Sequence, residues 1–390
     1  MLTEIRTEFP FFAARPELTY LDSAATTQKP QVVLEAMDRH LRTGTANPGR
    51  GSYRLASTLT SAIEEVRARA ATFIGAGDPA SVAFTNGATG SLNAITQCWG
   101  AHNLRAGDEV LLSPSDHAAN VEPWFQLAER TGVRIVPYQL TASGIPDLTD
   151  VAEKVTPATK VVVLTHVHNV FGERTDIAEI RRRIGSDIVI SVDAAQSVGH
   201  IPLDTTALGA DFVAFSAHKM FGPPGVGVLW AAPRVAADMR PAVVGGGMSG
   251  RSGLTEIVEA GTLNTVGIVG FGAALGFIES IGTKVISARL SAMTRILVER
   301  LKTMSNVELL PGTAFSTGLT GYGIVSFRVP GMSAADAGFV LDADGICVRT
   351  GGHCAHDSQL AGESVRISAH IYNTDAELDR VCKAVAELQP

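Results

Sequence analysis

Cysteine is scarce in this sequence, and its spacing argues against the common uses of paired thiols. The 390 residues contain four cysteines, at positions 98, 347, 354 and 382, and none of them forms a Cys-x-x-Cys pair. Structural metal sites and disulfide frameworks need closely or regularly spaced cysteines. We therefore expect free thiols in a reducing cytoplasm. Cys98, Cys347 and Cys382 stand among apolar neighbours and look like core residues, whereas Cys354 follows two glycines and does not.

The sequence also lacks an excess of basic residues and any long hydrophobic run. The formal net charge is -7 and the pI is about 5.8, so we expect neither nucleic acid nor an anionic membrane as the main partner, because both attract basic surfaces. The most apolar stretch, residues 266–278, is interrupted by glycine and is too short to cross a bilayer. Residues 1–8 carry acidic side chains where a signal peptide needs a basic start, so we expect no export signal. Small molecules and other proteins remain as partners.

What the sequence does contain is enough apolar material for a large enzyme core. Hydrophobic residues make up 45% of the chain and charged residues 18%, which is typical of a globular protein of two domains. Between residues 16 and 258, short apolar runs alternate with helical patterns, which predicts a mostly parallel sheet. The predicted strands are 81–84, 109–112, 134–138, 160–164, 187–192, 211–215 and 226–230. The last two are joined only by a turn and should be antiparallel.

The pattern changes after a helix that begins near Thr265. A long amphipathic helix over 284–304 is followed by strands at 307–310 and 323–329, a helix over 333–341, a strand at 347–349 and a final helix from Asp375. Mixed strands and helices without the earlier alternation are typical of a smaller α+β domain.

Lys219 and Asp193 form the most informative pair in the chain. Lys219 stands on a glycine- and proline-containing turn directly after the apolar strand 211–215, and Asp193 ends the apolar run 188–193. They are 219 − 193 = 26 residues apart, about one step from strand to neighbouring strand in an α/β sheet. Alone, each would be an ordinary turn or cap residue. Together they are what pyridoxal phosphate requires, an amine for its aldehyde and a carboxylate that keeps its ring nitrogen protonated.

With His218 before the lysine and Gln196 three residues after Asp193, the pattern resembles the fold-type I pyridoxal phosphate enzymes, specifically the class V aminotransferase family. The resemblance implies an α/β fold: a large domain whose sheet is mostly parallel with one antiparallel strand, and a smaller α+β C-terminal domain. We expect residues 1–15 to form an N-terminal arm that packs on the small domain. Residues 16–265 would form the large cofactor-binding domain. Residues 266–390 would form a connecting helix and the small domain, which carries the Cys354 loop.

The resemblance also implies how the cofactor phosphate is held. The segment 85–91 follows a strand and opens a helix, where backbone N–H groups and a hydroxyl can bind a phosphate. The residues implied for this role are Ala88, Thr89, Ser216 and His218. A second clamp, at Gly261 and Thr262, would reach over from the neighbouring subunit, so that the active sites of a homodimer are shared.

Further residues are implied around the cofactor ring. His117 lies after the strand that ends at Leu112, and the resemblance implies that it stacks on the ring and moves protons. Asn169 and Gln196 would face the phenolic oxygen of the cofactor. These contacts would hold the ring in one orientation relative to the substrate bond that breaks.

The segment Arg349-Thr350-Gly351-Gly352-His353-Cys354 narrows the resemblance to the SufS-like, or group II, cysteine desulfurases. The similarity runs from Leu21-Asp22-Ser23-Ala24-Ala25 to Tyr372-Asn373-Thr374. The planar fork of Arg349 can bind an amino acid carboxylate, and Cys354 can attack a substrate sulfur as a thiolate. Arg366 and Ala24 are implied as further substrate contacts, and no residues are predicted to bind a metal.

The resemblance implies that L-cysteine is converted to L-alanine and that its sulfur forms a persulfide on Cys354, which passes to an acceptor protein. Two alternatives on the same scaffold stay open: a selenocysteine lyase, and a C–S lyase that acts on another sulfur-containing amino acid. A sulfur-relay scaffold with vestigial catalysis is disfavoured, because Lys219, Asp193, His117 and Arg349 are all present.

The chain departs from the SufS-like pattern in two ways, at two single residues and in the length of one stretch. Gly49 stands before Arg50 where these enzymes tend to have histidine, and Gly90 stands where they tend to have glutamate. The stretch 245–259 is short for a group that usually has a hairpin there. These departures leave substrate selectivity and the sulfur acceptor open.

Overall fold

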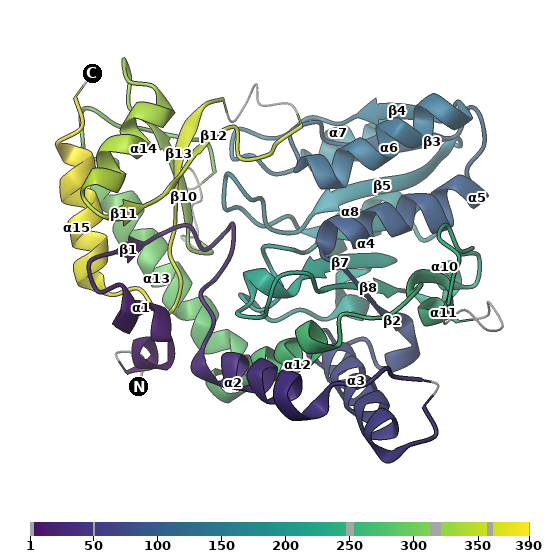
Figure 1. The fold of residues 1–390 in the computed structure, drawn as a ribbon. Coiled ribbons are helices and arrows are strands. Elements are labelled where there is room, and N and C mark those ends of the chain that lie inside the picture. Colours follow the sequence, from purple (N-terminus) through teal and green to yellow (C-terminus); the bar gives the residue numbers. More distant parts are fainter. Residues whose placement is uncertain (1–3, 50, 247–252, 313–320, 357–361, 390) are drawn as a thin grey trace.

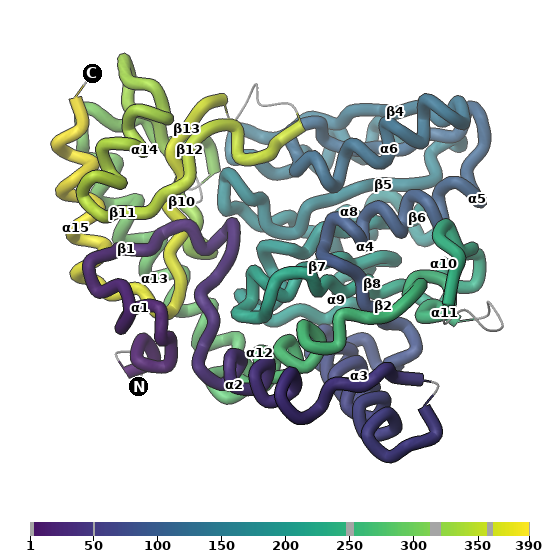
Figure 2. Tube along the Cα trace, viewed as in Figure 1, coloured from purple at the N-terminus to yellow at the C-terminus, as the bar shows by residue number. Residues whose placement is uncertain are grey.

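The structure is a computed structural model that describes residues 4–49, 51–246, 253–312, 321–356 and 362–389 (Figure 1). Its larger part carries the blue and teal strands and its smaller part the yellow-green ones, and the first and last described residues both lie on the smaller part. The tube in Figure 2 shows the purple N-terminal segment passing along the boundary between the two parts before it reaches α2 (Gln31–Arg39). Part of the short segment 245–259 noted in the sequence lies outside the described residues. Arg50 also lies outside them.

In the described part of the chain, seven strands form the central sheet of the larger part, in the order β2-β8-β7-β6-β5-β3-β4. They are β2 (Val82–Thr85), β3 (Glu109–Leu112), β4 (Arg134–Pro137), β5 (Thr159–Thr165), β6 (Val189–Asp193), β7 (Phe212–Ser216) and β8 (Gly227–Ala231). The strands β3 to β7 pair in parallel, whereas β8 is antiparallel to both of its neighbours. The predicted sheet, with one antiparallel strand after the Lys219 turn, is confirmed.

Alternate side chains of these strands point into two separate apolar cores. Val162 and Leu164 of β5 lie in one core, and Val161 and Val163 lie in the other. Because successive side chains of a strand point to opposite faces, a strand that is covered on both faces needs an unbroken apolar run. The first core includes residues of α3 (Arg54–Phe73), α8 (Ile177–Ile184) and α12 (Thr265–Ile281), and the second includes residues of α4 (Ala88–Ala94) and α6 (Ala118–Thr131).

Helix α12 is glycine-rich because it packs closely on its neighbours. A Cβ atom at Gly270 would lie 2.7 Å from Cγ of Met37 on α2, and one at Gly272 would lie 2.5 Å from Cγ2 of Val66 on α3. Among the described residues, no single helix is long and apolar enough to span a membrane. By length and composition α12 meets that condition only together with α13 (Thr283–Leu301), and the two are bent by 77°.

The smaller part is built on an antiparallel sheet in the order β12-β13-β10-β9. Its strands are β9 (Glu308–Leu309), β10 (Ile324–Arg328), β12 (Arg349–Gly351) and β13 (Ser364–Ser368), with helices α13, α14 (Ala334–Ala343) and α15 (Asp375–Ala386). Near the N-terminus, β1 (Thr19–Tyr20) pairs in parallel with β11 (Ile346–Cys347). Phe9 packs its ring on Tyr372, with ring centroids 4.9 Å apart. The first residues described therefore contact the smaller part.

The remaining helices are short connections. They are α1 (Pro10–Ala14), α5 (Ala101–Asn103), α7 (Leu148–Lys154), α9 (Thr205–Leu208), α10 (Pro233–Ala236) and α11 (Leu254–Val258), the 3-10 turns Ile5–Glu8, Pro79–Ser81 and Ala217–Lys219, and the π-helical turns His40–Gly44 and Ile95–Gly100.

The structure differs from the sequence prediction in the smaller part, where the strands β1 and β13 were not predicted. The predicted strand 347–349 is divided into β11 and β12, which pair with β1 and β13 respectively and belong to different sheets. Cys347 is consequently half-buried, whereas Cys98 and Cys382 are buried as expected and Cys354 is exposed.

Candidate active site

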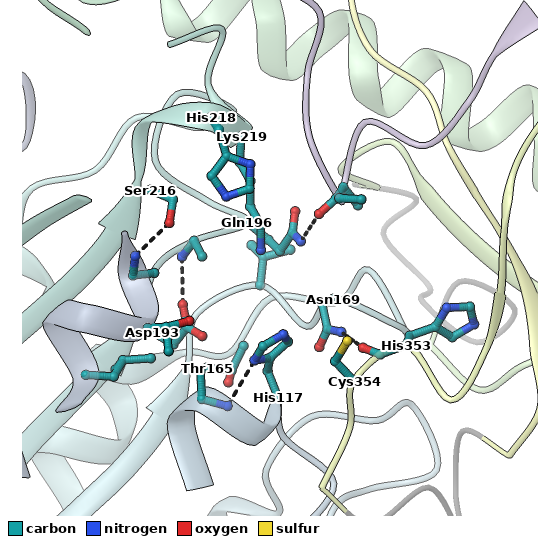
Figure 3. A pocket seen from close by; sticks show the side chains of 18 of the residues that line it. His117, Thr165, Asn169, Asp193, Gln196, Ser216, His218, Lys219, His353 and Cys354 are labelled. Carbon is teal, nitrogen blue, oxygen red and sulfur yellow. Dashed lines mark hydrogen bonds between the residues drawn. The ribbon is translucent and has the colours of Figure 1, made fainter. Parts of the chain in front are cut away.

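One pocket brings together residues from the carboxyl ends of the central strands and from the smaller part (Figure 3). Its lining includes the predicted site residues Ala24, Ala88, Thr89, His117, Asn169, Asp193, Gln196, Ser216, His218, Lys219, Arg349, Cys354 and Arg366. The carboxyl edge is where ligands bind in open α/β sheets, because the strands there end in loops that carry polar side chains. The position of the pocket thus follows from the topology of the sheet.

Lys219 and Asp193 lie on the side of the pocket formed by the larger part. Asp193 is the last residue of β6, and Lys219 ends the short 3-10 turn that follows the parallel neighbour β7. Burial lowers the pKa of Lys219, and the negative charge of Asp193 opposes that shift. The Asp193 side chain is 6% exposed and accepts a hydrogen bond of 2.8 Å from the backbone N–H of Ala195. The pocket therefore holds a desolvated amine near a fixed carboxylate.

The start of α4 lies beside Ser216, the last residue of β7. Gly87 precedes the helix with φ 142°, in a region that favours glycine, and the backbone N–H of Ala88 donates to Ser216 Oγ at 2.7 Å. Strand β8 passes close behind this turn, since a Cβ atom at Gly227 would lie 2.3 Å from the carbonyl carbon of Gly87. The arrangement fixes backbone donors and hydroxyl groups at the positive end of a helix, which suits a phosphate.

His117 is held by the helix that it begins. Its Nδ1 accepts a hydrogen bond of 3.1 Å from the backbone N–H of Ala119, so it caps α6 with its side chain. Burial lowers the pKa of His117, and Asp193 opposes this shift. With Nδ1 occupied as an acceptor, the neutral ring carries its proton on Nε2. The ring is therefore fixed in one tautomer at the edge of the pocket.

Asn169 and Gln196 both use their amide groups to bind backbone carbonyls that border the pocket. Asn169 Nδ2 donates to the carbonyl oxygen of His353 at 2.9 Å, and Gln196 Nε2 donates to that of Ala24 at 2.8 Å. The Oδ1 atom of Asn169 is buried and has no hydrogen-bond partner among the described residues. These two side chains tie segments of the smaller part and of the N-terminal region to the larger part.

Cys354 lies on a loop with an unusual backbone. His353 and Cys354 have φ angles of 51° and 61°, in the left-handed region that few residues other than glycine adopt. The loop is fastened to the start of α6, because Ala118 N–H donates to the carbonyl oxygen of Cys354 at 2.8 Å. His353 Nε2 is 2.8 Å from Ser364 Oγ on β13. The thiol thus stands exposed on a constrained turn that borders the pocket.

A second attachment of the Cys354 loop was not predicted from the sequence. His356 Nδ1 lies 2.7 Å from Glu122 Oε1 on α6, and the His356 ring stacks on Phe125 with centroids 5.0 Å apart. The Glu122 side chain is 59% exposed, whereas Phe125 is partly buried against the second apolar core. The sequence around His356 offered no signal for this contact.

Arg349 and Arg366 lie directly opposite each other on the neighbouring strands β12 and β13. Both bind the carboxylate of Asp22, with Arg349 Nη2 at 3.1 Å and Arg366 Nη2 at 3.2 Å from its oxygens. Arg366 Nη1 also donates to the carbonyl oxygen of Asn169 at 2.9 Å. Asp22 belongs to the Leu21–Ala25 motif, but no role was predicted for it.

Asp116 is another residue that the sequence prediction missed. It is buried beside His117, and Asn120 Nδ2 donates to its Oδ2 at 3.2 Å. Burial raises the pKa of Asp116 to about 7, and the nearby charge of Asp193 adds to the shift. Its place directly before His117 in the sequence was the available signal.

Gly261 and Thr262 do not reach the pocket of their own chain. Thr262 lines a separate hollow with Asn86 and Gly90, and Gly261 N–H donates to the carbonyl oxygen of Gly246 at 2.8 Å. A contact with the pocket of a second subunit stays a prediction.

The residues of the pocket fit pyridoxal phosphate. Lys219 offers an amine whose lowered pKa favours the neutral form that attacks an aldehyde. Asp193 is suited to a protonated ring nitrogen, the start of α4 with Ser216 to a phosphate, and the unpartnered Oδ1 of Asn169 to a polar group of a ligand. Each group that the cofactor needs is present on one wall of the pocket.

Comparisons with known proteins agree with this geometry. A family model described as aminotransferase class V matches residues 19–381. A protein named cysteine desulfurase from Klebsiella pneumoniae is 36% identical, over 99% of this chain and 97% of its own. A probable cysteine desulfurase from Vibrio cholerae is 34% identical, over 98% of this chain and 97% of its own. Among solved structures, the apo cysteine desulfurase from Thermococcus onnurineus is 32% identical with a TM-score of 0.90, over 98% of this chain and 97% of that one.

Proposed function

The chain belongs to the class V aminotransferase family, and on this premise we propose that it is a pyridoxal phosphate-dependent cysteine desulfurase. It converts L-cysteine to L-alanine and keeps the sulfur as a persulfide on Cys354. The observation that carries the proposal is that Cys354, Lys219 and Arg349 line the same pocket. A thiol nucleophile, an amine for the cofactor and a carboxylate-binding fork are the three groups that the reaction needs.

When bound, the cofactor supplies an electron sink for the bond that breaks at the substrate Cα. The residues of the chain bind and orient the reactants around it. Arg349 receives the substrate carboxylate, because it lines the same pocket as Asp193 and Lys219 and its guanidinium can bind a carboxylate with two parallel hydrogen bonds. Lys219, whose pKa is lowered by burial, takes the Cα proton as a neutral amine. His117 carries its own proton on Nε2 and can donate it within the pocket.

Sulfur transfer is the step that Cys354 performs. The Cys354 thiolate attacks the substrate Sγ and an S–S bond forms between them. The Cβ–Sγ bond breaks, its electron pair stays with Cβ, and Cβ then takes a proton so that alanine leaves. One cysteine and one enzyme thiol thus give one alanine and one enzyme persulfide.

The proposal also covers the sulfur acceptor, the oligomeric state and the location of the enzyme. The persulfide passes to an acceptor protein, which the exposure of Cys354 supports. The enzyme is a homodimer with shared sites, which the position of Thr262 outside its own pocket supports. It works in the cytoplasm, where four free cysteines stay reduced.

The deciding experiment treats the purified yellow protein with L-cysteine. We expect one alanine per sulfur lost, and a Cys354 peptide that gains the mass of one sulfur atom. Cys354→Ala should keep the cofactor colour and form no alanine, whereas Cys347→Ala, seven positions earlier in the chain, should behave like the wild type. If Cys354→Ala makes alanine at the wild-type rate, Cys354 is not the group that takes the sulfur and the proposal is wrong.

A further inference from the structure

Asp22 binds both arginines at the rim of the pocket. Its Oδ1 and Oδ2 lie 3.2 and 3.3 Å from Arg349 Nε, and Oδ2 lies 3.1 Å from Arg349 Nη2. Its Oδ1 also accepts from Arg366 Nη2 at 3.2 Å. One carboxylate is therefore shared by two guanidinium groups, and the three side chains together keep one net positive charge.

The two arginines need such a partner because of where the sheet places them. Arg349 and Arg366 are cross-strand partners on β12 and β13, and like charges directly opposite each other destabilise a sheet. The Arg366 side chain is only 3% exposed, and a buried charge without a partner is strongly unfavourable. Asp22 offsets both effects from a third segment of the chain.

The backbone holds Asp22 between the strands that carry the arginines. Leu21 N–H donates to the carbonyl oxygen of Cys347 at 2.9 Å, and the carbonyl oxygen of Leu21 accepts from Ser368 N–H at 2.7 Å. Asp22 itself forms a parallel bridge with Ser368. Cys347 lies two residues before Arg349, and Ser368 lies two residues after Arg366. The carboxylate is thus fixed relative to both guanidinium groups by main-chain bonds.

The bonds to Asp22 use one edge of the Arg349 guanidinium. They engage Nε and Nη2, and they leave Nη1 outside this pairing. The Arg349 side chain is 40% exposed and lines the pocket. A long, half-exposed side chain samples many rotamers unless something fixes it, and fixing it beforehand lowers the entropy lost when a ligand binds.

On the basis of the proposed function, we propose that Asp22 is a positioning residue for the substrate carboxylate. It holds Arg349 by the Nε–Nη2 edge and so presents the Nη1 edge to the amino acid. It also reduces the charge of the arginine pair to the single positive charge that one carboxylate neutralises. Asp22 acts through Arg349 and takes no part in the transfer of sulfur.

The test measures ligand binding separately from turnover in the holoenzyme. L-Alanine, the product, carries the same carboxylate without the sulfur, and its binding is followed by the change in visible absorbance of the bound cofactor. We expect Asp22→Asn to raise the Kd of L-alanine and the KM of L-cysteine about tenfold, the size of one lost charge-assisted hydrogen bond. The value of kcat should stay within about threefold. Asp22→Glu, which keeps the charge, should recover part of the affinity.

A double-mutant cycle shows whether Asp22 acts through Arg349. Adding Asp22→Asn to Arg349→Ala should change the Kd of L-alanine less than twofold, because the side chain that Asp22 positions is already gone. Full additivity overturns the proposal, and so does an Asp22→Asn protein with unchanged Kd or with a fall in kcat alone. If Asp22→Asn does not fold, Asp22→Glu decides: a Kd raised more than twofold supports the proposal, and an unchanged Kd overturns it.

Two controls separate the effect of Asp22 on ligand binding from the loss of any other Arg–Asp pair and from a failure of the proposed function. Asp375→Asn removes an Arg–Asp pair remote from the pocket, the one between Arg289 and Asp375 at 2.9 Å, and should leave the Kd unchanged. A wild-type protein that binds L-alanine but makes none from L-cysteine would contradict the desulfurase function and leave the role of Asp22 measurable.

Discussion

The two walls of the pocket are built in different ways. On the wall of the larger part, Asp193 and Ser216 end parallel strands and are 6% and 4% exposed. On the wall of the smaller part, Cys354 stands on a loop with left-handed backbone angles, and the Arg349 side chain is 40% exposed. The first wall places its groups by the register of a sheet that is buried on both faces. The second places Cys354 by a few polar contacts of its loop. We call the first the rigid wall and the second the adaptable wall.

The largest effect expected from this difference concerns Lys219. Lys219→Ala should abolish turnover, because no other lysine among the described residues lines the pocket. Borohydride reduction of the wild type should fix the cofactor to the Lys219 peptide, and mass spectrometry of a digest measures this.

Lys29 provides the matched control for Lys219. Burial lowers the pKa of Lys29 to about 8, and its ammonium donates to the backbone carbonyl of Thr27. It therefore also has a lowered pKa, but it does not line the pocket. Lys29→Ala should retain cofactor attachment and turnover, and a reduced cofactor on the Lys29 peptide would contradict the assignment.

Asp193→Asn should lower turnover by one to two orders of magnitude while the protein stays yellow. The exchange removes a charge-assisted hydrogen bond worth about 1.5 to 3 kcal/mol to the cofactor ring, which corresponds to about tenfold to a hundredfold in rate. Steady-state alanine formation is the measurement, with cofactor content determined for each preparation. Turnover within twofold of the wild type would show that the rigid wall does not act through this carboxylate.

The pH dependence of stability tests how strongly the Asp116 carboxyl is shielded from water. Its pKa is raised to about 7 from the usual 3.8, mainly by burial. Between these values the folded protein holds a proton that the unfolded chain releases, so stability falls as the pH rises. From pH 5 to pH 8, the wild type should lose about 2 kcal/mol of unfolding free energy relative to Asp116→Asn. Urea unfolding of both proteins at the two pH values measures this, and parallel pH dependences would contradict it.

The smallest effect is expected on the adaptable wall. His356→Ala removes the contacts with Glu122 and Phe125 that fasten the Cys354 loop to α6. Because a half-exposed polar contact contributes below about 1 kcal/mol, the rate of Cys354 alkylation by iodoacetamide should rise only about threefold. Glu122→Gln should raise the alkylation rate by a similar factor, whereas Glu129→Gln on the same helix should leave it unchanged. An unchanged alkylation rate in both of the first two variants would show that these contacts do not hold the loop.

The sequence was most informative about the rigid wall. Apolar runs such as 109–112 coincide with the strands they predict, and the spacing of Asp193 and Lys219 places them at the ends of adjacent strands. A buried parallel strand needs a continuous apolar run, so its position can be read locally. The predicted membership in the class V family is confirmed as well.

The adaptable wall was harder to predict because its contacts join distant segments. No strand was predicted at 364–368, where Arg366 interrupts the apolar pattern and its guanidinium binds Asp22 and Asn169. Asn169 and Gln196 were expected to face the cofactor, and the structure shows each of them also binding a backbone carbonyl. Such pairings depend on which loops meet in space, and local patterns carry no information about that.

The bond between Asp22 and Arg349 joins residues 327 positions apart. During synthesis on the ribosome, β1 and Asp22 emerge long before the strands that receive them, and they must wait for almost the whole chain. Contacts between such distant segments form slowly, because a long loop has to close before any of them is gained. A chain released before residue 366 would therefore contain Lys219 and Asp22 but could not form the pair of Arg349 and Arg366 that Asp22 joins.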